Sequence, residues 1–363
     1  MKVLHIAEAN GGVEKYLEML LKNTTDYKNV LICSNLFSEI QSEKQYSLDF
    51  SRTLSPIRNI KIIKKIRSII KIENPDIVFC HSTFAGIWGR IALIGLHKKV
   101  VYNPHGWAFD MDTSNIKKSI FTIIERMFSV VTDKYMMISE YEYQSAKRHH
   151  ITNANKLSIV MNAVDEGALL DDANVNLNSD VIEMLEDKFV IGMVGRIDLQ
   201  KGPDIFIKMA NIVKKDIPNA YFVIVGDGKM KNEITRLADE NKLSDSLLIT
   251  GWVNNTAMYI KQFDISILLS RWEGFGLVLA EYMFLNKPII STNVGAITNL
   301  INDSRSGILI ESEDYESAAK VVKNLYTNQD QRQQLANNGL KYANENLTVE
   351  KFISNYRDFI EEL

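Results

Sequence analysis

The 363-residue chain has only two cysteines, Cys33 and Cys80, and each ends a short strand-like run of apolar residues. Two thiols placed in this way cannot build a metal cluster or a disulfide scaffold, so we expect both to be buried as small hydrophobic side chains. The sequence contains no run of 18 apolar residues, and its first apolar stretch soon gives way to acidic and glycine residues. We therefore expect neither a membrane span nor a secretory signal. The protein is expected to be cytoplasmic.

A strong charge of one sign is also absent, because the net charge is −3. This balance and the lack of a recognition motif disfavour nucleic acid as a partner. The two halves nevertheless differ, since residues 1–160 carry 22 Lys/Arg and 15 Asp/Glu, whereas residues 161–363 carry 20 and 30. We expect the halves to be electrostatically different bodies.

Much of the basic excess of the first half lies in residues 57–72. At helical spacing five isoleucines of this segment fall within an arc of about 120°, and lysines and arginines cover much of the remaining surface. The pattern predicts a cationic amphipathic helix that packs its isoleucines on a sheet. Its basic face is also suited to weak, peripheral contact with anionic lipid on the inner face of the membrane. The five isoleucines within the arc are Ile62, Ile63, Ile66, Ile69 and Ile70, and the cations of the segment are Arg58, Lys61, Lys64, Lys65, Arg67 and Lys71.

Short apolar, β-branched runs alternate with amphipathic helical stretches through both halves, which is typical of parallel sheets covered by helices. Each half holds six such runs. The fold class is therefore α/β, with two Rossmann-like doubly wound domains rather than one long sheet. The runs of the first half begin at residues 2, 30, 76, 100, 135 and 157, and those of the second at 189, 220, 247, 265, 288 and 307.

The boundary between the domains is predicted near residue 165. Residues 165–180 are rich in aspartate and have no sustained helical or alternating apolar period, which is typical of a linker. We expect an N-terminal domain over 1–164, a linker over 165–187 and a C-terminal domain over 188–347. Residues 348–363 are predicted to form a closing helix.

Ligands of parallel sheets bind at the carboxyl ends of strands, so candidate residues are sought there. Gly11 and Gly12 open a helix after the first strand, where backbone amides could face an anion. His105 follows the strand that begins at residue 100 and stands beside Gly106. A tight structural turn and a structural histidine are the alternatives to a binding role at these two places.

The loop VGRIDLQKG follows the first strand of the second half and places Arg196 and Lys201 at a helix start. A planar guanidinium clamps phosphate oxygens and an ammonium adds a point charge, so the two cations predict a diphosphate site. Gly195 and Gly202 would permit close approach of the ligand. The GDG at 226–228 forms a second glycine-containing turn after the next strand, but it lacks the full dinucleotide fingerprint.

The segment EGFGLVLAE places Glu273 before a glycine-rich helix start and Glu281 eight residues later inside an apolar helix. A buried carboxylate is costly without partners, and a ribose diol offers two hydroxyl donors. The backbone N–H groups of residues 274–276 could receive a bound or developing negative charge. A carboxylate paired with Arg or Lys is the structural alternative.

The motifs GGVEKYL, PHGW, ISEYEYQSA, NAVD, VGRIDLQKG, VGDGKM, TGWV and EGFGLVLAE occur in an order that resembles the retaining glycosyltransferases of family 4. The resemblance extends over essentially the whole chain. It implies the GT-B fold, in which two Rossmann-like domains face each other across a cleft. It also implies that the N-terminal domain binds the acceptor, the C-terminal domain binds the nucleotide sugar, and the last helix crosses back to the N-terminal domain.

The resemblance further implies roles for individual residues. Arg196 and Lys201 would hold the donor diphosphate, and Glu281 would hold the ribose hydroxyls. Glu273 would hold the donor sugar, with His105 beside it. The implied catalytic residues are thus His105, Arg196, Lys201 and Glu273. The remaining donor-binding positions are Gly12, Gly226, Val253, Gly274, Phe275, Gly276 and Leu277.

The implied activity is transfer of a hexose or N-acetylhexosamine from a nucleotide diphosphate sugar, with uridine as the base, to a hydroxyl of a growing cell-surface glycan. Retention with front-face attack comes from the resemblance alone, because no second carboxylate marks a covalent nucleophile. Trp88, Trp107, Phe109 and Met111 could line an apolar approach for a lipid-linked acceptor, or could pack in the core. A sugar-nucleotide epimerase and a non-enzymatic nucleotide-sugar-binding protein remain alternatives.

No metal or other cofactor is expected. Asp110 and Asp112 spell an Asp-x-Asp, but no nearby His, Asp or Glu would complete a coordination shell. The donor diphosphate would already have Arg196 and Lys201 to balance its charge. We therefore expect the two aspartates to be a solvated pair at a helix start.

Overall fold

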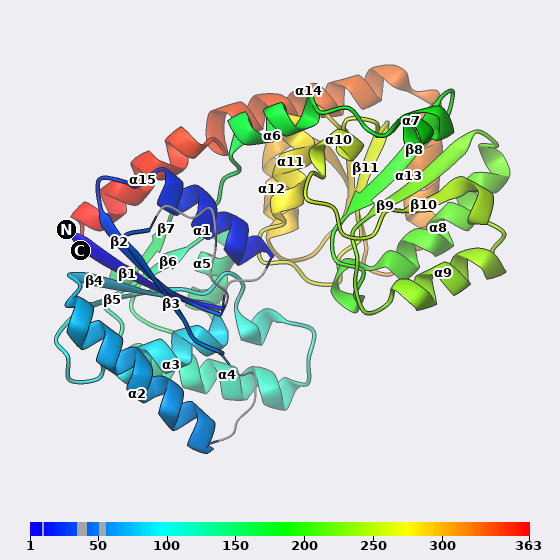
Figure 1. Cartoon of the computed structure of the whole chain (residues 1–363). Helices are drawn as coiled ribbons and strands as arrows, with labels where there is room; N and C mark the ends of the chain where they lie inside the picture. Colours follow the sequence, from blue (N-terminus) through cyan, green and yellow to red (C-terminus); the bar gives the residue numbers. More distant parts are fainter. Residues whose placement is uncertain (9–10, 35–41, 51–55) are drawn as a thin grey trace. The chain divides into compact units, whose positions relative to one another are not determined.

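The computed structural model describes residues 1–8, 11–34, 42–50 and 56–363, with side chains from residue 59 onward in the last range. The side chain of Arg58 therefore lies outside the described part. The chain divides into two compact units, which are described separately (Figure 1). Unit 1 consists of Met1–Ala163 and Val349–Leu363, and unit 2 consists of Val164–Thr348.

Unit 1 is built on a seven-stranded parallel sheet with the order β3-β2-β1-β4-β5-β6-β7. All six strands predicted for this half are present. The seventh, β3, was not predicted, because its sequence KQYS is short and polar and lies at the edge of the sheet. The strands are β1 (Lys2–Ala7), β2 (Lys28–Cys33), β3 (Lys44–Ser47), β4 (Ile77–His81), β5 (Lys99–Asn103), β6 (Lys134–Met137) and β7 (Leu157–Ile159).

Two layers of helices cover this sheet (Figure 1). Helices α1 and α15 pack on one face, where Phe352, Tyr356 and Phe359 of α15 are buried. Helices α2 to α5 contribute to the core on the other face. The helices are α1 (Gly12–Lys22), α2 (Pro56–Glu73), α3 (Thr83–Leu93), α4 (Asn115–Phe128), α5 (Glu140–Arg148) and α15 (Val349–Glu361), with 3-10 turns η1 (Ala108–Asp110) and η2 (Ala154–Lys156).

Helix α2 is the predicted cationic amphipathic helix. Ile62, Ile66, Ile69 and Ile70 are buried in the core, and Ile63 packs against it. The lysines at positions 61, 64, 65 and 71 are exposed. Both cysteines of the chain are buried, as their apolar context predicted.

Unit 2 is built on a six-stranded parallel sheet with the order β10-β9-β8-β11-β12-β13, and all six strands were predicted. Its strands are β8 (Phe189–Val194), β9 (Ala220–Val225), β10 (Leu247–Ile249), β11 (Ile265–Leu268), β12 (Ile289–Thr292) and β13 (Gly307–Ile310). Its helices are α6 (Glu166–Ala173), α7 (Ser179–Leu185), α8 (Pro203–Asp216), α9 (Lys231–Glu240), α10 (Ala257–Ile260), α11 (Leu277–Phe284), α12 (Gly295–Ser304), α13 (Tyr315–Thr327) and α14 (Gln329–Asn346), with 3-10 turns η3 (Leu199–Lys201) and η4 (Ser244–Ser246).

The stretch expected to be a linker holds α6 and α7. Each helix starts at a side-chain cap, where the Asp165 carboxylate accepts from Ala168 N and the Asn178 side chain accepts from Asp180 N. Each helix buries at most two side chains, so the sequence has no apolar period that would predict it. Caps of this kind supply the hydrogen bonds that such short helices need.

Candidate functional site

In unit 2 the loops that follow β8 and β11 are bonded to each other at the carboxyl edge of the sheet. Arg271 N donates to Gln200 O at 2.7 Å, and Gln200 Nε2 donates to Trp272 O at 3.1 Å. The Arg271 guanidinium binds both carboxylate oxygens of Asp204 at 2.8 and 3.0 Å and donates to Leu199 O. The two loops are therefore held in place by the protein's own hydrogen bonds.

Lys201 and Glu273 come from these two loops and form an ion pair, with Nζ 2.5 Å from Oε2. Their side chains are only 14% and 12% exposed, so water screens the pair little. Ser270 Oγ donates to the same carboxylate oxygen at 3.3 Å. Because an ammonium has three donors, Lys201 can keep this contact and still donate to a bound anion.

Arg196 is more open than Lys201, with 59% of its side chain exposed. Its Nη2 donates to Gln200 Oε1 at 3.0 Å, and its Nε lies 3.5 Å from Asp198 Oδ2. A guanidinium has five N–H donors, so these contacts leave donors for a ligand. The sequence marked both cations but did not predict Gln200, which links Arg196 to the second loop.

The glycines around these loops are required by contacts within the protein. A Cβ on Gly226 would lie 2.0 Å from the carbonyl oxygen of Gly195, and a Cβ on Gly202 would lie 2.2 Å from that of Leu269. Space that we expected to admit a ligand at Gly202 is thus filled by backbone. The role of Gly226 in donor binding stays a prediction.

Helix α11 begins at Gly276, whose φ of 83° suits glycine, and its N-terminus has no side-chain cap. The start of α12 lies against the same place, because a Cβ on Gly295 would lie 2.2 Å from the carbonyl oxygen of Glu273. Phe275, just before the helix, is buried. First-turn amides without a side-chain cap are well suited to bind an anion.

Glu281 is the fifth residue of α11 and is only 5% exposed. The prediction of a buried glutamate inside an apolar helix is confirmed. The neighbouring Tyr282 fixes the helix on the sheet, since its hydroxyl accepts from Val194 N at 2.9 Å. Val253 lies two residues beyond Gly251, which pairs with Gly226 in an isolated bridge.

In unit 1 three histidines form a hydrogen-bonded chain, His5 in β1, His81 at the end of β4 and His105 after β5. His5 Nδ1 lies 3.1 Å from His81 Nε2, and His81 Nδ1 lies 3.0 Å from His105 Nε2. The Tyr16 ring of α1 meets His105 edge-on at 4.6 Å between centroids. Of the three histidines, only His105 was predicted to have a role, although each of these strand regions contains a histidine.

Burial keeps all three rings neutral. It lowers the pKa of His5 to about 4 and the pKa of His105 to about 3. Burial and the two neighbouring rings hold the pKa of His81 well below its usual value. At neutral pH His105 therefore offers a neutral hydrogen-bonding ring rather than a positive charge.

The loop after His105 is bonded to Glu142 of α5. The Glu142 carboxylate accepts from Gly106 N and, at 3.0 Å, from Ile138 N, while Trp107 Nε1 donates to Glu142 O at 2.9 Å. Burial raises the pKa of Glu142 to about 8, against the opposite effect of the two backbone donors. The motif ISEYEYQSA contained this residue, but nothing in the sequence indicated its role.

Asp110 is not the solvated helix-start residue that we expected. It lies in η1, its Oδ1 accepts from Ser145 Oγ at 2.8 Å, and burial raises its pKa. Helix α4 starts later, after Ser114, and Asp112 is exposed. Within the described residues no group of three or more His, Cys, Asp or Glu side chains could hold a metal ion.

The predicted apolar approach for an acceptor is mostly core. Trp88, Trp107 and Phe109 are buried in the main cluster of unit 1, and only Met111 is exposed. Packing explains these three side chains, because they contact the sheet-facing core. Gly12 is exposed at the start of α1, directly after the described Gly11, whereas residues 9–10 lie outside the described part.

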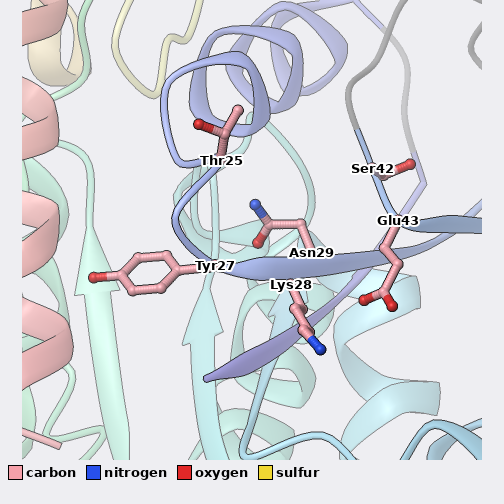
Figure 2. A pocket seen from close by; sticks show the side chains of 6 residues that line it. All are labelled: Thr25, Tyr27, Lys28, Asn29, Ser42 and Glu43. Carbon is pink, nitrogen blue, oxygen red and sulfur yellow. The ribbon is translucent and has the colours of Figure 1, made fainter.

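A shallow pocket lies at the amino ends of β2 and β3 (Figure 2). Parallel sheets bind ligands at the opposite, carboxyl edge, so we assign this pocket no part in the chemistry. It is lined by Thr25, Tyr27, Lys28, Asn29, Ser42 and Glu43.

Two family models match the chain. Residues 10–167 match the model described as Glycosyltransferase Family 4, and residues 176–342 match the one described as Glycosyl transferases group 1. Together the two matches account for most of both units.

Curated proteins and solved structures show the same likeness. The UDP-Gal:alpha-D-GlcNAc-diphosphoundecaprenol alpha-1,3-galactosyltransferase of Escherichia coli is 30% identical over 272 residues, which are 73% of this chain and 70% of that protein. An uncharacterized 41.2 kDa protein in the cps region of Klebsiella pneumoniae is 32% identical over 335 residues, 89% of each chain. The crystal structure of Anabaena HepE in complex with UDP-glucose has a TM-score of 0.83 at 16% identity and covers 100% of both chains.

Proposed function

Because the chain belongs to the family 4 glycosyltransferases of group 1 and has their GT-B fold, we propose that it is a retaining enzyme that uses a UDP-sugar. It would move a hexose or N-acetylhexosamine to a hydroxyl of a growing cell-surface glycan. One observation carries the proposal above all. The shielded Lys201–Glu273 pair lies beside the uncapped start of α11, the helix that buries Glu281.

The diphosphate of the donor is assigned to Arg196 and Lys201. During transfer the acceptor hydroxyl oxygen bonds to the anomeric carbon, and the bond from that carbon to the diphosphate oxygen breaks. In front-face attack the departing diphosphate takes the hydroxyl proton. Negative charge grows on the leaving oxygen, and preorganised cations and amides aimed at such charge usually give the largest catalytic effect.

The sugar is assigned to Glu273 and the amides of residues 274–277, as the family resemblance implies. The carboxylate can accept from sugar hydroxyls while Lys201 holds it in place. His105 is assigned to the sugar as well, where a neutral ring can exchange hydrogen bonds with a hydroxyl. Its hydrogen-bonded neighbour His81 fixes the orientation of that ring.

The names of the relatives support the donor and acceptor classes. The Escherichia coli relative is named for UDP-Gal and for a diphosphoundecaprenol-linked acceptor. The solved structure of HepE contains UDP-glucose. We therefore favour a UDP-linked donor and a lipid-linked glycan acceptor for this chain.

We propose that transfer needs no metal ion. Arg196, Lys201 and the first-turn amides of α11 provide the positive charge that a divalent ion would otherwise give to a leaving diphosphate. In Asp110, the first residue of the Asp-x-Asp, Oδ1 accepts a hydrogen bond from Ser145.

The Glu281→Ala variant is expected to bind UDP more weakly by about 1.5 to 3 kcal/mol, because it loses a charged hydrogen-bond acceptor for the ribose. This is a loss of roughly 10-fold to 150-fold in affinity. Isothermal titration calorimetry of the folded variant with UDP measures it directly.

A matched control is Glu233→Ala, which removes an exposed carboxylate from α9 of the same unit and should leave the affinity for UDP unchanged. If Glu281→Ala binds UDP as tightly as the parent protein does, Glu281 does not hold the ribose.

A further inference from the structure

Helix α4 presents apolar residues to solvent along its whole length. Ile116, Ile120, Ile123 and Met127 are 74%, 50%, 54% and 70% exposed. Their spacing places them on one face of the helix. Val130, just beyond the helix end, is 85% exposed as well. We call these five residues the α4 stripe.

The inner face of α4 is anchored by an ion pair. Glu125 binds Arg90 of α3 through two hydrogen bonds of 2.7 and 2.9 Å, and the two side chains are 4% and 0% exposed. Arg90 also stacks on the ring of Tyr102 at 3.8 Å. A surface helix ordinarily buries its most apolar face, so the outward direction of the α4 stripe needs another explanation.

The charges around the stripe are positive. Lys117 and Arg126 lie roughly 90° to either side of it on the helical wheel. Glu125 is the single carboxylate in the sequence of α4, and it points inward. The exposed acids nearest to the helix in the sequence, Asp112 and Asp133, lie beyond its two ends.

Helix α2 shows the same separation of charge. Its single carboxylate, Glu73, is buried and pairs with Lys2 at 3.2 Å and Lys44 at 3.0 Å. From residue 59 onward, where its side chains are described, the exposed charged residues of α2 are all lysines. Helices α2 and α4 contribute to the core on the same face of the unit 1 sheet (Figure 1).

We propose that the α4 stripe lies on the surface of an anionic membrane. The helix would rest parallel to the bilayer, with the stripe among the upper acyl chains and Lys117 and Arg126 at the headgroups. This combination of an apolar row with flanking cations is what interfacial helices use. A row one helix wide and about 21 Å long is too small for a standard protein–protein interface. Within the described residues no helix is long and apolar enough to cross the bilayer.

Vesicle flotation tests the proposal without any dependence on transferase activity. The full chain should float with vesicles that contain phosphatidylglycerol and phosphatidylcholine, and much less with phosphatidylcholine alone. The Ile120→Ser, Ile123→Ser double variant should partition at least about tenfold less, because it removes two inserted side chains. Lys117→Glu should also weaken binding, and added salt should weaken it further.

The control is Ile182→Ser, which removes an exposed isoleucine from α7 in unit 2 and should leave flotation unchanged. Since Ile120 and Ile123 are half exposed, the double variant should keep the parent's circular dichroism spectrum. The proposal is wrong if the folded double variant floats as well as the parent, or if the parent fails to float. It is also wrong if the double substitution abolishes a dimer seen by sedimentation, because the stripe would then join two copies.

Discussion

The Lys201→Ala variant is expected to turn over about 100-fold to 1000-fold more slowly than the parent, because it removes a preorganised donor from the leaving diphosphate. The substitution also deprives Glu273 of its ion-pair partner at 2.5 Å. The effect should fall mainly on kcat, since charge on the diphosphate grows in the transition state. Steady-state release of UDP from the best UDP-sugar measures it.

Two further variants separate the role of Lys201 from a general loss of charge. Lys215→Ala removes an exposed lysine near the other end of α8 and should leave turnover unchanged. Glu273→Gln combined with Lys201→Ala should cost less than the sum of the single effects, because the two side chains act as a pair. A folded Lys201→Ala protein with full turnover would rule out this lysine as the catalytic cation.

The Glu125→Ala variant is expected to lose about 3 to 5 kcal/mol of the free energy of unfolding of unit 1, because it leaves the buried guanidinium of Arg90 without its counterion. Arg90 has no exposed side-chain surface, so water cannot replace the carboxylate. Chemical denaturation followed by circular dichroism measures the loss.

The matching double variant is Arg90→Leu with Glu125→Leu. It removes both charges and should recover much of the stability, since apolar residues of similar volume often replace a buried pair at little cost. If Glu125→Ala unfolds at the same denaturant concentration as the parent, the pair does not anchor α4 to α3.

The strands were predictable because each is a buried, β-branched run between polar turns, and parallel sheets need such runs. Strand β3 was not predicted, because it is defined by its hydrogen bonds to β2 and not by apolar burial. Helices α6 and α7 were not predicted either, because they begin at side-chain caps and show no apolar period in the sequence.

The geometry of the site was less predictable than the strands were. Motif positions identified Lys201 and Glu273 separately, but their direct pairing depends on how two loops 72 residues apart meet. The chain His5–His81–His105 depends on strand order in the same way. The outward direction of the α4 stripe could not be predicted from the sequence either, because the helical pattern alone does not say which face of the helix packs on the sheet.

The most direct test of the central claim is the release of UDP from a panel of UDP-sugars, measured with a GlcNAc-diphospho-lipid acceptor and an excess of EDTA. We expect at least one UDP-sugar to give UDP together with an α-linked product, at a rate that EDTA does not change and that Lys201→Ala lowers about 100-fold to 1000-fold. If every UDP-sugar gives no more UDP than the Lys201→Ala background while the protein still binds UDP, the chain is a nucleotide-sugar-binding protein and not the proposed enzyme.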